Sequence, residues 1–156
     1  MEFESGEVRK VRRVLWHWGR VDKRIDDLIE RMRVAVDRAN SLYEVGGSRP
    51  MDGQPRGSMP GDPVFRAVEQ IQRMRELFAQ EIETCEAQIR EEQDFKVAVN
   101  NAISKLTPVQ QDVLRLRYVG HHDWVYIGYK LFMTDRNARR YDFTACVELA
   151  QIIDVS

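Results

Sequence analysis

Two long stretches of helical periodicity, separated by a segment rich in glycine and proline, constrain the fold of this chain more than any other feature. The segment, residues 46–63, contains five glycines and four of the five prolines in the chain. Proline lacks the backbone N–H that helices and strands use, and glycine loses the most conformational freedom on ordering. We therefore expect residues 46–63 to form a flexible surface loop between two helices.

Before this loop, residues 7–45 carry apolar side chains at the spacing of a heptad repeat. The pattern predicts one long helix with an apolar seam on one side and charges of both signs on the other. The seam consists of Val11, Leu15, Trp18, Ile25, Ile29, Met32, Val36, Ala39 and Tyr43.

After the loop, Asp62 suits an N-cap and Pro63 suits the first helical turn, so a second helix is expected to begin there. Its stripe loses the heptad phase between Ile89 and Phe95, which predicts a local change of supercoil or a bend. Because neither stripe is stable alone in water, we expect an antiparallel, coiled-coil-like hairpin over residues 1–106. The spacing leaves open whether pairing lies within one chain, between two chains as a homodimer, or both. The second stripe consists of Val64, Val68, Ile71, Met74, Phe78, Ile82, Cys85, Ile89, Phe95, Val99, Ile103 and Leu106.

Composition narrows the class of protein. No apolar run approaches the roughly 20 residues that span a bilayer, and the N-terminus lacks an apolar signal region. Cys85 and Cys146 lie within helical patterns and are expected to be reduced core thiols. We therefore expect a cytoplasmic protein without a membrane partner. The net charge of −1 gives no overall basic field, so any basic surface must be local.

Residues 107–156 contain three short helical patterns, each with its own start. Thr107 can cap the first, with Pro108 in the first helical position and Gln110 completing a capping box. Asp123 is a suitable N-cap for the second helix, and Thr134 for the third. Residues 132–133 are expected to form the tight turn between the last two helices. This order predicts a three-helix domain with a helix-turn-helix, separate from residues 1–106 and within an all-α protein.

The third of these helices is expected to bury a stripe made of Ala138, Tyr141, Ala145, Leu149 and Ile152. Its other face begins with basic and amide side chains, and residues 130–140 hold four bases and one acid. Arginine can recognise guanine with two hydrogen bonds, asparagine can recognise adenine, and both hold phosphates. The expected DNA-contacting residues are Lys130, Arg136, Asn137, Arg139, Arg140, Phe143 and Thr144.

Residues 106–149 resemble the C-terminal domain of sigma-70-type factors, which binds the −35 promoter element. The first part matches at Leu106, Pro108, Val113, Leu114, Leu116, Arg117 and Tyr118, and the rest at Trp124, Ile127, Leu131, Thr134 and Arg139. The whole order of segments is similar to that of the phage-encoded ArpU/RinA-like transcription regulators. The resemblance implies promoter binding in phage or prophage transcription, with RNA polymerase as a candidate partner. Gly128 stands where the family prefers alanine, and Phe132 where its turn usually has glycine.

Two other functions fit the same pattern: a phage terminase small subunit that binds packaging DNA, and a helical interaction module that binds no DNA. The chain contains no glycine-rich phosphate loop, no zinc-ligand spacing and no nucleophile with a recognisable base. We expect no catalysis, no cofactor and no metal site, and interpret residues 121–123 as a turn with an N-cap. Trp16 and Trp18 are expected to cover the end of the hairpin or to dock against the C-terminal domain.

Overall fold

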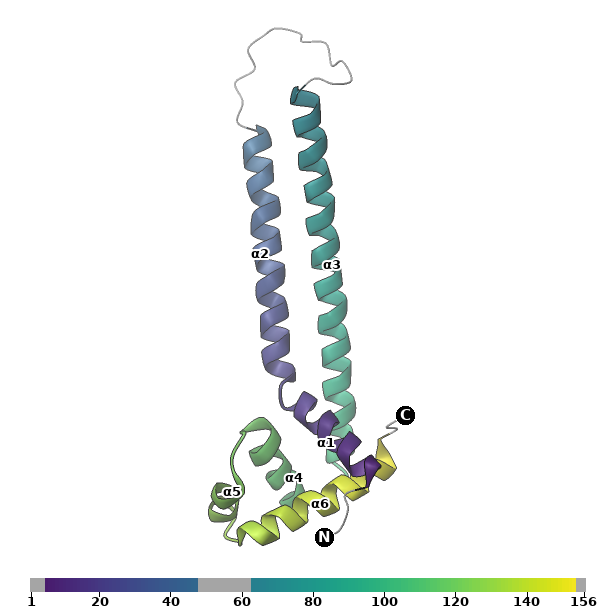
Figure 1. Ribbon diagram of the computed structural model, residues 1–156, viewed down its shortest axis with the longest axis vertical. Helices are drawn as coiled ribbons and strands as arrows, with labels where there is room; N and C mark the ends of the chain where they lie inside the picture. The colour runs from purple at the N-terminus through teal and green to yellow at the C-terminus, as the bar shows by residue number, and fades with distance from the viewer. Residues whose placement is uncertain (1–4, 48–62, 154–156) are drawn as a thin grey trace. The chain divides into compact units, whose positions relative to one another are not determined.

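The computed structural model describes residues 5–47 and 63–153, and these residues are almost entirely helical (Figure 1). No strand occurs within these two ranges, so the expected all-α class is confirmed. The expected loop lies almost wholly outside the described residues, and so does the proposed N-cap Asp62. The elements are α1 (Gly6–Trp18), α2 (Val21–Gly47), α3 (Pro63–Ile103), α4 (Pro108–Leu114), the π-helical turn η1 (Arg115–Val119), α5 (Trp124–Lys130) and α6 (Asp135–Ile152).

The chain divides into two compact units, and the division differs from the expected boundary between residues 106 and 107. Unit 1 consists of Met1–Arg24 and Glu91–Ser156, and unit 2 of Ile25–Arg90. The physical reason is a shared core, because α1 and the end of α3 pack with the C-terminal helices. The core of unit 1 includes Val8, Val11, Leu15, Trp18, Val99, Ala102, Ile103, Leu106, Leu114, Tyr118, Ala145, Cys146 and Leu149.

The continuous helix predicted over residues 7–45 is wrong at one point. α1 ends at Trp18, and α2 begins at Val21. Between them, a Cβ at Gly19 would overlap the carbonyl oxygen of Tyr118. The chain therefore passes Tyr118 at a distance that only glycine permits. This contact joins residues far apart in sequence, so the heptad pattern could not reveal it.

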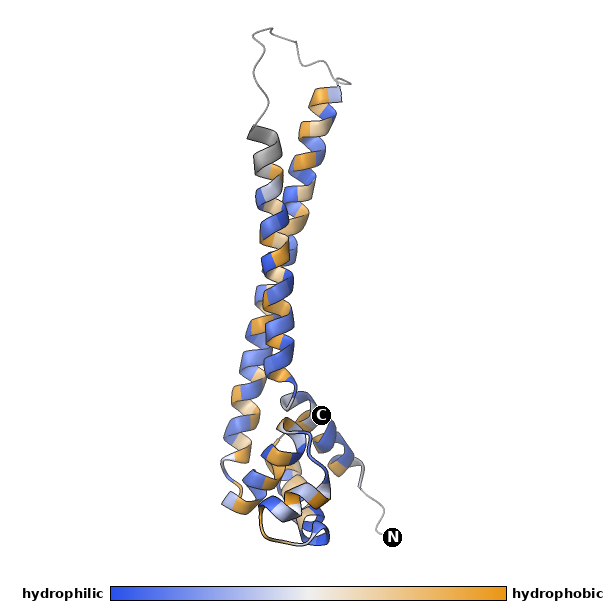
Figure 2. Cartoon of the chain, turned by 90° about the vertical axis from the view of Figure 1, so that its left-hand side faces the viewer, coloured by the Kyte–Doolittle hydropathy of each residue, from blue (hydrophilic) through white to orange (hydrophobic). Residues whose placement is uncertain are grey.

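In unit 2, α2 and α3 lie side by side and run in opposite directions (Figures 1 and 2). Arg31 forms an ion pair with Glu81 at 3.6 Å, and Arg75 Nη2 donates a hydrogen bond to the carbonyl oxygen of Leu42 at 3.4 Å. α3 continues as one helix through the phase break between Ile89 and Phe95. Apolar and polar residues alternate along both helices, as the mixed colours of Figure 2 show.

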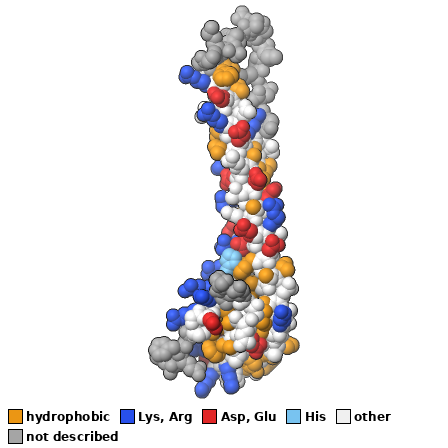
Figure 3. All heavy atoms as spheres, turned by 90° about the vertical axis from the view of Figure 1, so that its right-hand side faces the viewer, with side chains coloured by type: hydrophobic (Ala, Val, Ile, Leu, Met, Phe, Trp, Pro, Cys, Tyr) orange, Lys and Arg blue, Asp and Glu red, His pale blue; other side chains and the backbone are white. Residues whose placement is uncertain are grey.

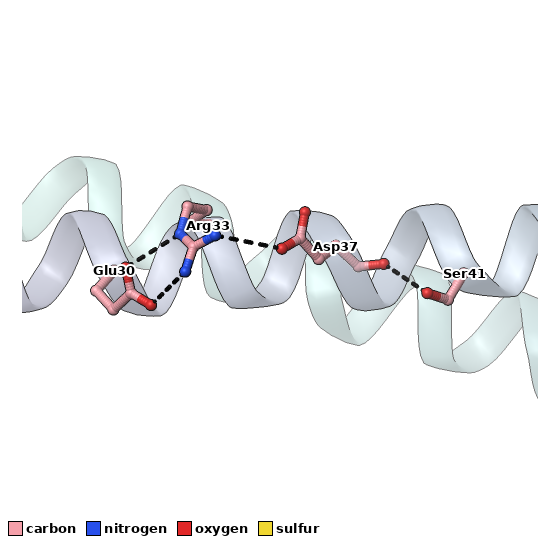
Figure 4. A network of polar contacts seen from close by, with 4 residues as sticks. All are labelled: Glu30, Arg33, Asp37 and Ser41. Carbon is pink, nitrogen blue, oxygen red and sulfur yellow. Dashed lines mark hydrogen bonds and ion pairs between the residues drawn. The ribbon is translucent and has the colours of Figure 1, made fainter.

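Polar contacts run along the surface of α2 in this unit. Arg33 donates two hydrogen bonds to Glu30, at 2.7 and 3.1 Å, and lies 3.8 Å from an Asp37 carboxylate oxygen (Figure 4). Ser41 Oγ donates to the carbonyl oxygen of Asp37 at 2.9 Å. Glu30 and Arg33 are well exposed, and water and salt screen such pairs, so unit 2 does not depend on them. None of the helices that the structure describes has both the length and the apolar character needed to cross a membrane.

Candidate nucleic-acid interface

The start of α6 is set by local hydrogen bonding, as predicted. Thr134 has an extended backbone, and its side-chain oxygen accepts a hydrogen bond from Asn137 N at 3.1 Å. Asp135 follows in the first turn, where a carboxylate interacts favourably with the helix dipole. The other two predicted caps are confirmed as well, with a full capping box at Thr107 and Gln110 and a cap at Asp123.

The turn between α5 and α6 requires glycine at an unexpected position. A Cβ at Gly128 would lie 2.6 Å from the carbonyl oxygen of Met133 and 3.1 Å from Asp135 N. Met133 N also donates a hydrogen bond to the carbonyl oxygen of Gly128, at 2.9 Å. The turn therefore folds back directly onto α5, and the first residue of α6 lies against it.

Phe132 occupies this turn with a φ of 56°, in the left-handed region that favours glycine. Its side chain is 98% exposed, so no packing compensates for the backbone conformation. This is the position at which the turn of the sigma-like pattern usually has glycine, and the backbone has a positive φ there although the residue is phenylalanine.

A small apolar core holds α6 against α4 and α5. Val113, Ile127 and Ala138 are fully buried, one from each helix, and Leu116, Trp124, Leu131 and Met133 pack against them. Ala138 lies one turn into α6, so its packing against α4 and α5 fixes the position of the start of this helix. The residues on either side of Ala138 are exposed to solvent.

A buried polar cluster fixes the middle of α6. Asp142 is 1% exposed and accepts hydrogen bonds from Tyr118 Oη at 2.8 Å and from Arg12 Nη2 at 3.2 Å. Burial raises the pKa of Asp142, while the Tyr118 hydrogen bond and the Arg12 charge oppose that rise. Burial also raises the pKa of Tyr118, and it raises that of the neighbouring Cys146 to about 12. One carboxylate therefore joins α1, η1 and α6.

The predicted buried stripe of α6 is partly wrong. Ala138, Ala145 and Leu149 are buried as expected, but Tyr141 and Ile152 are each 39% exposed. Asp142 and Cys146 are buried in addition. The buried face consists of residues 138, 142, 145 and 149. This helical spacing could have placed residue 142, an aspartate, on the buried face. Hydrophobicity alone favoured Tyr141 over Asp142.

The basic and amide side chains of the first two turns of α6 are all exposed. Arg136, Arg140 and Phe143 share one face, because they are four and three residues apart. Asn137 and Arg139 lie on either side of that face, and Lys130 is exposed at the end of α5. Within the described ranges, Lys130, Arg136, Arg139 and Arg140 form no ion pair. Figure 3 shows Lys and Arg side chains on the surface among hydrophobic and acidic ones.

Thr144 has a different environment from the other predicted residues. Its hydroxyl donates to the carbonyl oxygen of Tyr141 at 3.1 Å and accepts from Gln110 Nε2 at 3.2 Å. Gln110 is itself buried and belongs to the capping box of α4. Thr144 thus connects α6 to α4, whereas the side chains of Arg136, Arg139 and Arg140 make no such contact with the residues that the structure describes.

Aromatic contacts tie the N-terminal helix to this domain. Trp16 packs edge-on against Tyr118, with ring centroids 4.8 Å apart, and stacks on His121 at 5.8 Å. The Arg117 guanidinium lies over the rings of both Trp16 and Trp124, and it donates to the carbonyl oxygen of His122 at 3.0 Å. The expected docking of Trp16 against the C-terminal helices is confirmed.

The arrangement provides positive charge and hydrogen-bond donors on a rigid helix. Among the described side chains, no group of three or more His, Cys, Asp or Glu is placed to hold a metal ion. The buried groups that titrate, Asp142, Tyr118 and Cys146, are engaged in the core. Comparison of the chain with family models, with curated proteins and with solved structures finds no match.

Proposed function

We propose that this protein binds double-stranded DNA and regulates transcription in the manner of a sigma-70-like, phage-type regulator. In this proposal α5 and α6 form a helix-turn-helix, and the first two turns of α6 enter the major groove. The α2–α3 pair acts as a coiled-coil-like hairpin. The observation that carries the proposal is the row of exposed guanidinium groups at the start of α6, none of which forms an ion pair with another residue that the structure describes.

Charge supports the assignment. Guanidinium groups that lack a carboxylate partner are free to hold phosphates or to recognise guanine. Arg136 and Arg140 share the face that would meet DNA, and Asn137 beside them can recognise adenine. The N-terminal end of α6 adds the positive end of its dipole, which favours phosphate.

Rigidity supports it as well. A helix that recognises base edges must be held in a fixed orientation by its own domain. α6 is held at Ala138 by the core with α4 and α5, and at Asp142 by hydrogen bonds from two other elements. Its exposed side chains therefore project from a fixed scaffold.

The sequence pattern over residues 106–149 supports promoter DNA as the target. The three capped helices and the short turn that the pattern implies are consistent with the observed elements. RNA polymerase is a further proposed partner, and the proposal places the protein in the cytoplasm.

Fluorescence anisotropy with a labelled duplex tests the role of α6. Replacing both Arg139 and Arg140 by alanine should raise the dissociation constant at least about tenfold, because a base or phosphate contact of this kind contributes about 1–3 kcal/mol. The matched control replaces Lys23 and Lys105 by alanine, which removes the same charge from exposed positions of unit 1 outside α5 and α6.

The proposed role of α6 requires the control variant to bind within about twofold of the wild type while the arginine variant loses affinity. Equal affinities for all three proteins would contradict it. A duplex selected from a random pool should then show sequence preference, and Asn137→Ala should relax that preference at one base position.

A further inference from the structure

We propose that unit 2 pairs with unit 2 of a second copy of this chain, with the two α2–α3 pairs running head to tail. The proposal rests on the burial and the charge distribution of residues 25–42 and 63–90. It does not require the protein to bind DNA. Each copy would contribute one pair of helices to a four-helix assembly.

Unit 2 buries little of its apolar surface by itself. Among its described side chains, only Ala35 and Cys85 are buried. Amphipathic helices owe most of their stability in water to the packing of their apolar faces, so this pair lacks the burial that it needs. Large apolar side chains stay exposed on both helices: Ile29, Val34, Val36, Val64, Phe65, Val68, Met74 and Leu77.

Charge is segregated along the length of unit 2. We call residues 25–30 and 81–90 the acidic end, because they hold six acids and one base. We call residues 31–42 and 63–80 the basic end, because they hold six bases and three acids. The Arg31–Glu81 pair shows that the two helices meet near the junction of these ends.

This segregation identifies the partner as a second copy in one orientation. Two copies packed head to tail place each acidic end against a basic end, so that both contacts are attractive. Two copies packed in the same direction oppose like charges at both ends. A two-fold axis between the copies makes each contact occur twice, as in most homodimers.

Several charges are available for such contacts. Arg33 is engaged with Glu30 and Asp37, and Arg73 with Glu69. By contrast, Arg38 and Arg66 at the basic end, and Glu83 and Glu86 at the acidic end, are exposed. None of these four forms an ion pair within the parts of the chain that the structure describes.

Sedimentation equilibrium of the full chain tests the proposal with charge reversal at each end. Arg38→Glu with Arg66→Glu reverses the basic end, and Glu83→Arg with Glu86→Arg reverses the acidic end. Each double variant should weaken the dimer at least about tenfold, and the variant with all four changes should recover to within about threefold of the wild type. Lys10→Glu with Lys23→Glu is the matched control for the basic-end variant, since it lowers the net charge by the same amount in unit 1.

Recovery in the fourfold variant is specific to the head-to-tail arrangement, because only there does a double reversal restore opposite charges. Circular dichroism checks that every variant keeps its helix content. A wild-type chain that stays monomeric, a ring-shaped assembly, or a fourfold variant no tighter than either double variant would overturn the proposal.

Discussion

Phe132 is a bulky residue whose backbone adopts a conformation that favours glycine. Its φ of 56° belongs to a conformation that costs a residue other than glycine roughly 1 kcal/mol or more. The ring is almost fully exposed, so the folded state gains nothing from its packing. The turn keeps its shape because Gly128 and the Thr134 cap fix the chain on both sides.

Replacing Phe132 by glycine should therefore stabilise the protein. The expected gain in the free energy of unfolding is about 0.5–1 kcal/mol, because relief of the positive φ exceeds the added entropy of the unfolded chain. Urea denaturation followed by circular dichroism measures this. Phe132→Ala is the control, since it removes the ring but keeps the Cβ. A glycine variant less stable than the alanine variant would show that the turn is not strained.

For single residues, hydrogen bonds between near neighbours in the chain could be predicted from the sequence, whereas contacts between distant segments could not. The caps at Thr107, Asp123 and Thr134 were predicted because each acts on residues two or three positions away. The burial of Asp142 was missed, because its partners Arg12 and Tyr118 come from other elements. Gly128 departs from a family pattern, but its close approach to Met133 is set by how the turn folds back onto α5 and not by the residue type alone.

Among the helices, the two units differ in how much each buries. α1, the end of α3, α4, η1 and α6 share a core that includes thirteen buried residues. Residues 25–42 and 63–90 bury only Ala35 and Cys85. Local opening follows the amount of buried apolar surface, so unit 2 should open more readily than unit 1.

The two cysteines report this difference, because Cys85 lies in unit 2, Cys146 lies in unit 1, and both are buried. In single-cysteine variants made by alanine substitution, a thiol reagent should label Cys85 at least about tenfold faster than Cys146 under native conditions. The basic-end reversal, Arg38→Glu with Arg66→Glu, provides the background, so that dimer formation does not protect Cys85 and no charge beside Cys85 is changed. Both thiols should react equally fast in denaturant. Faster labelling of Cys146 would contradict the order of stability.

Helix type and helix starts were predictable at this scale, whereas the break in the first helix was not. Heptad spacing continues smoothly through Gly19, and a single glycine in an exposed helix is tolerated. At this break, the backbone of Tyr118 occupies the space that a side chain at position 19 would fill. The expected bend near residue 91 does not interrupt α3, since a helix can continue when its apolar stripe shifts phase.

For the whole molecule, the division into units groups the N-terminal segment with the C-terminal helices. α1 belongs to the C-terminal domain, where Arg12 bonds to Asp142 of α6 and Trp16 packs on Tyr118. Removing the first 20 residues would therefore remove part of the scaffold that holds α6. The boundary could not be predicted, because it joins segments that lie at opposite ends of the sequence.

The salt dependence of duplex binding tests the central claim most directly, namely that α6 presents its basic face to DNA. Each neutralised phosphate contributes about −0.9 to the slope of log K against log salt concentration. Wild-type protein should show a slope of roughly −2 or steeper, and Arg139→Ala with Arg140→Ala should reduce its size by about 1 or more. A wild-type affinity that does not change with salt, or a slope that is the same in the variant, would contradict the account.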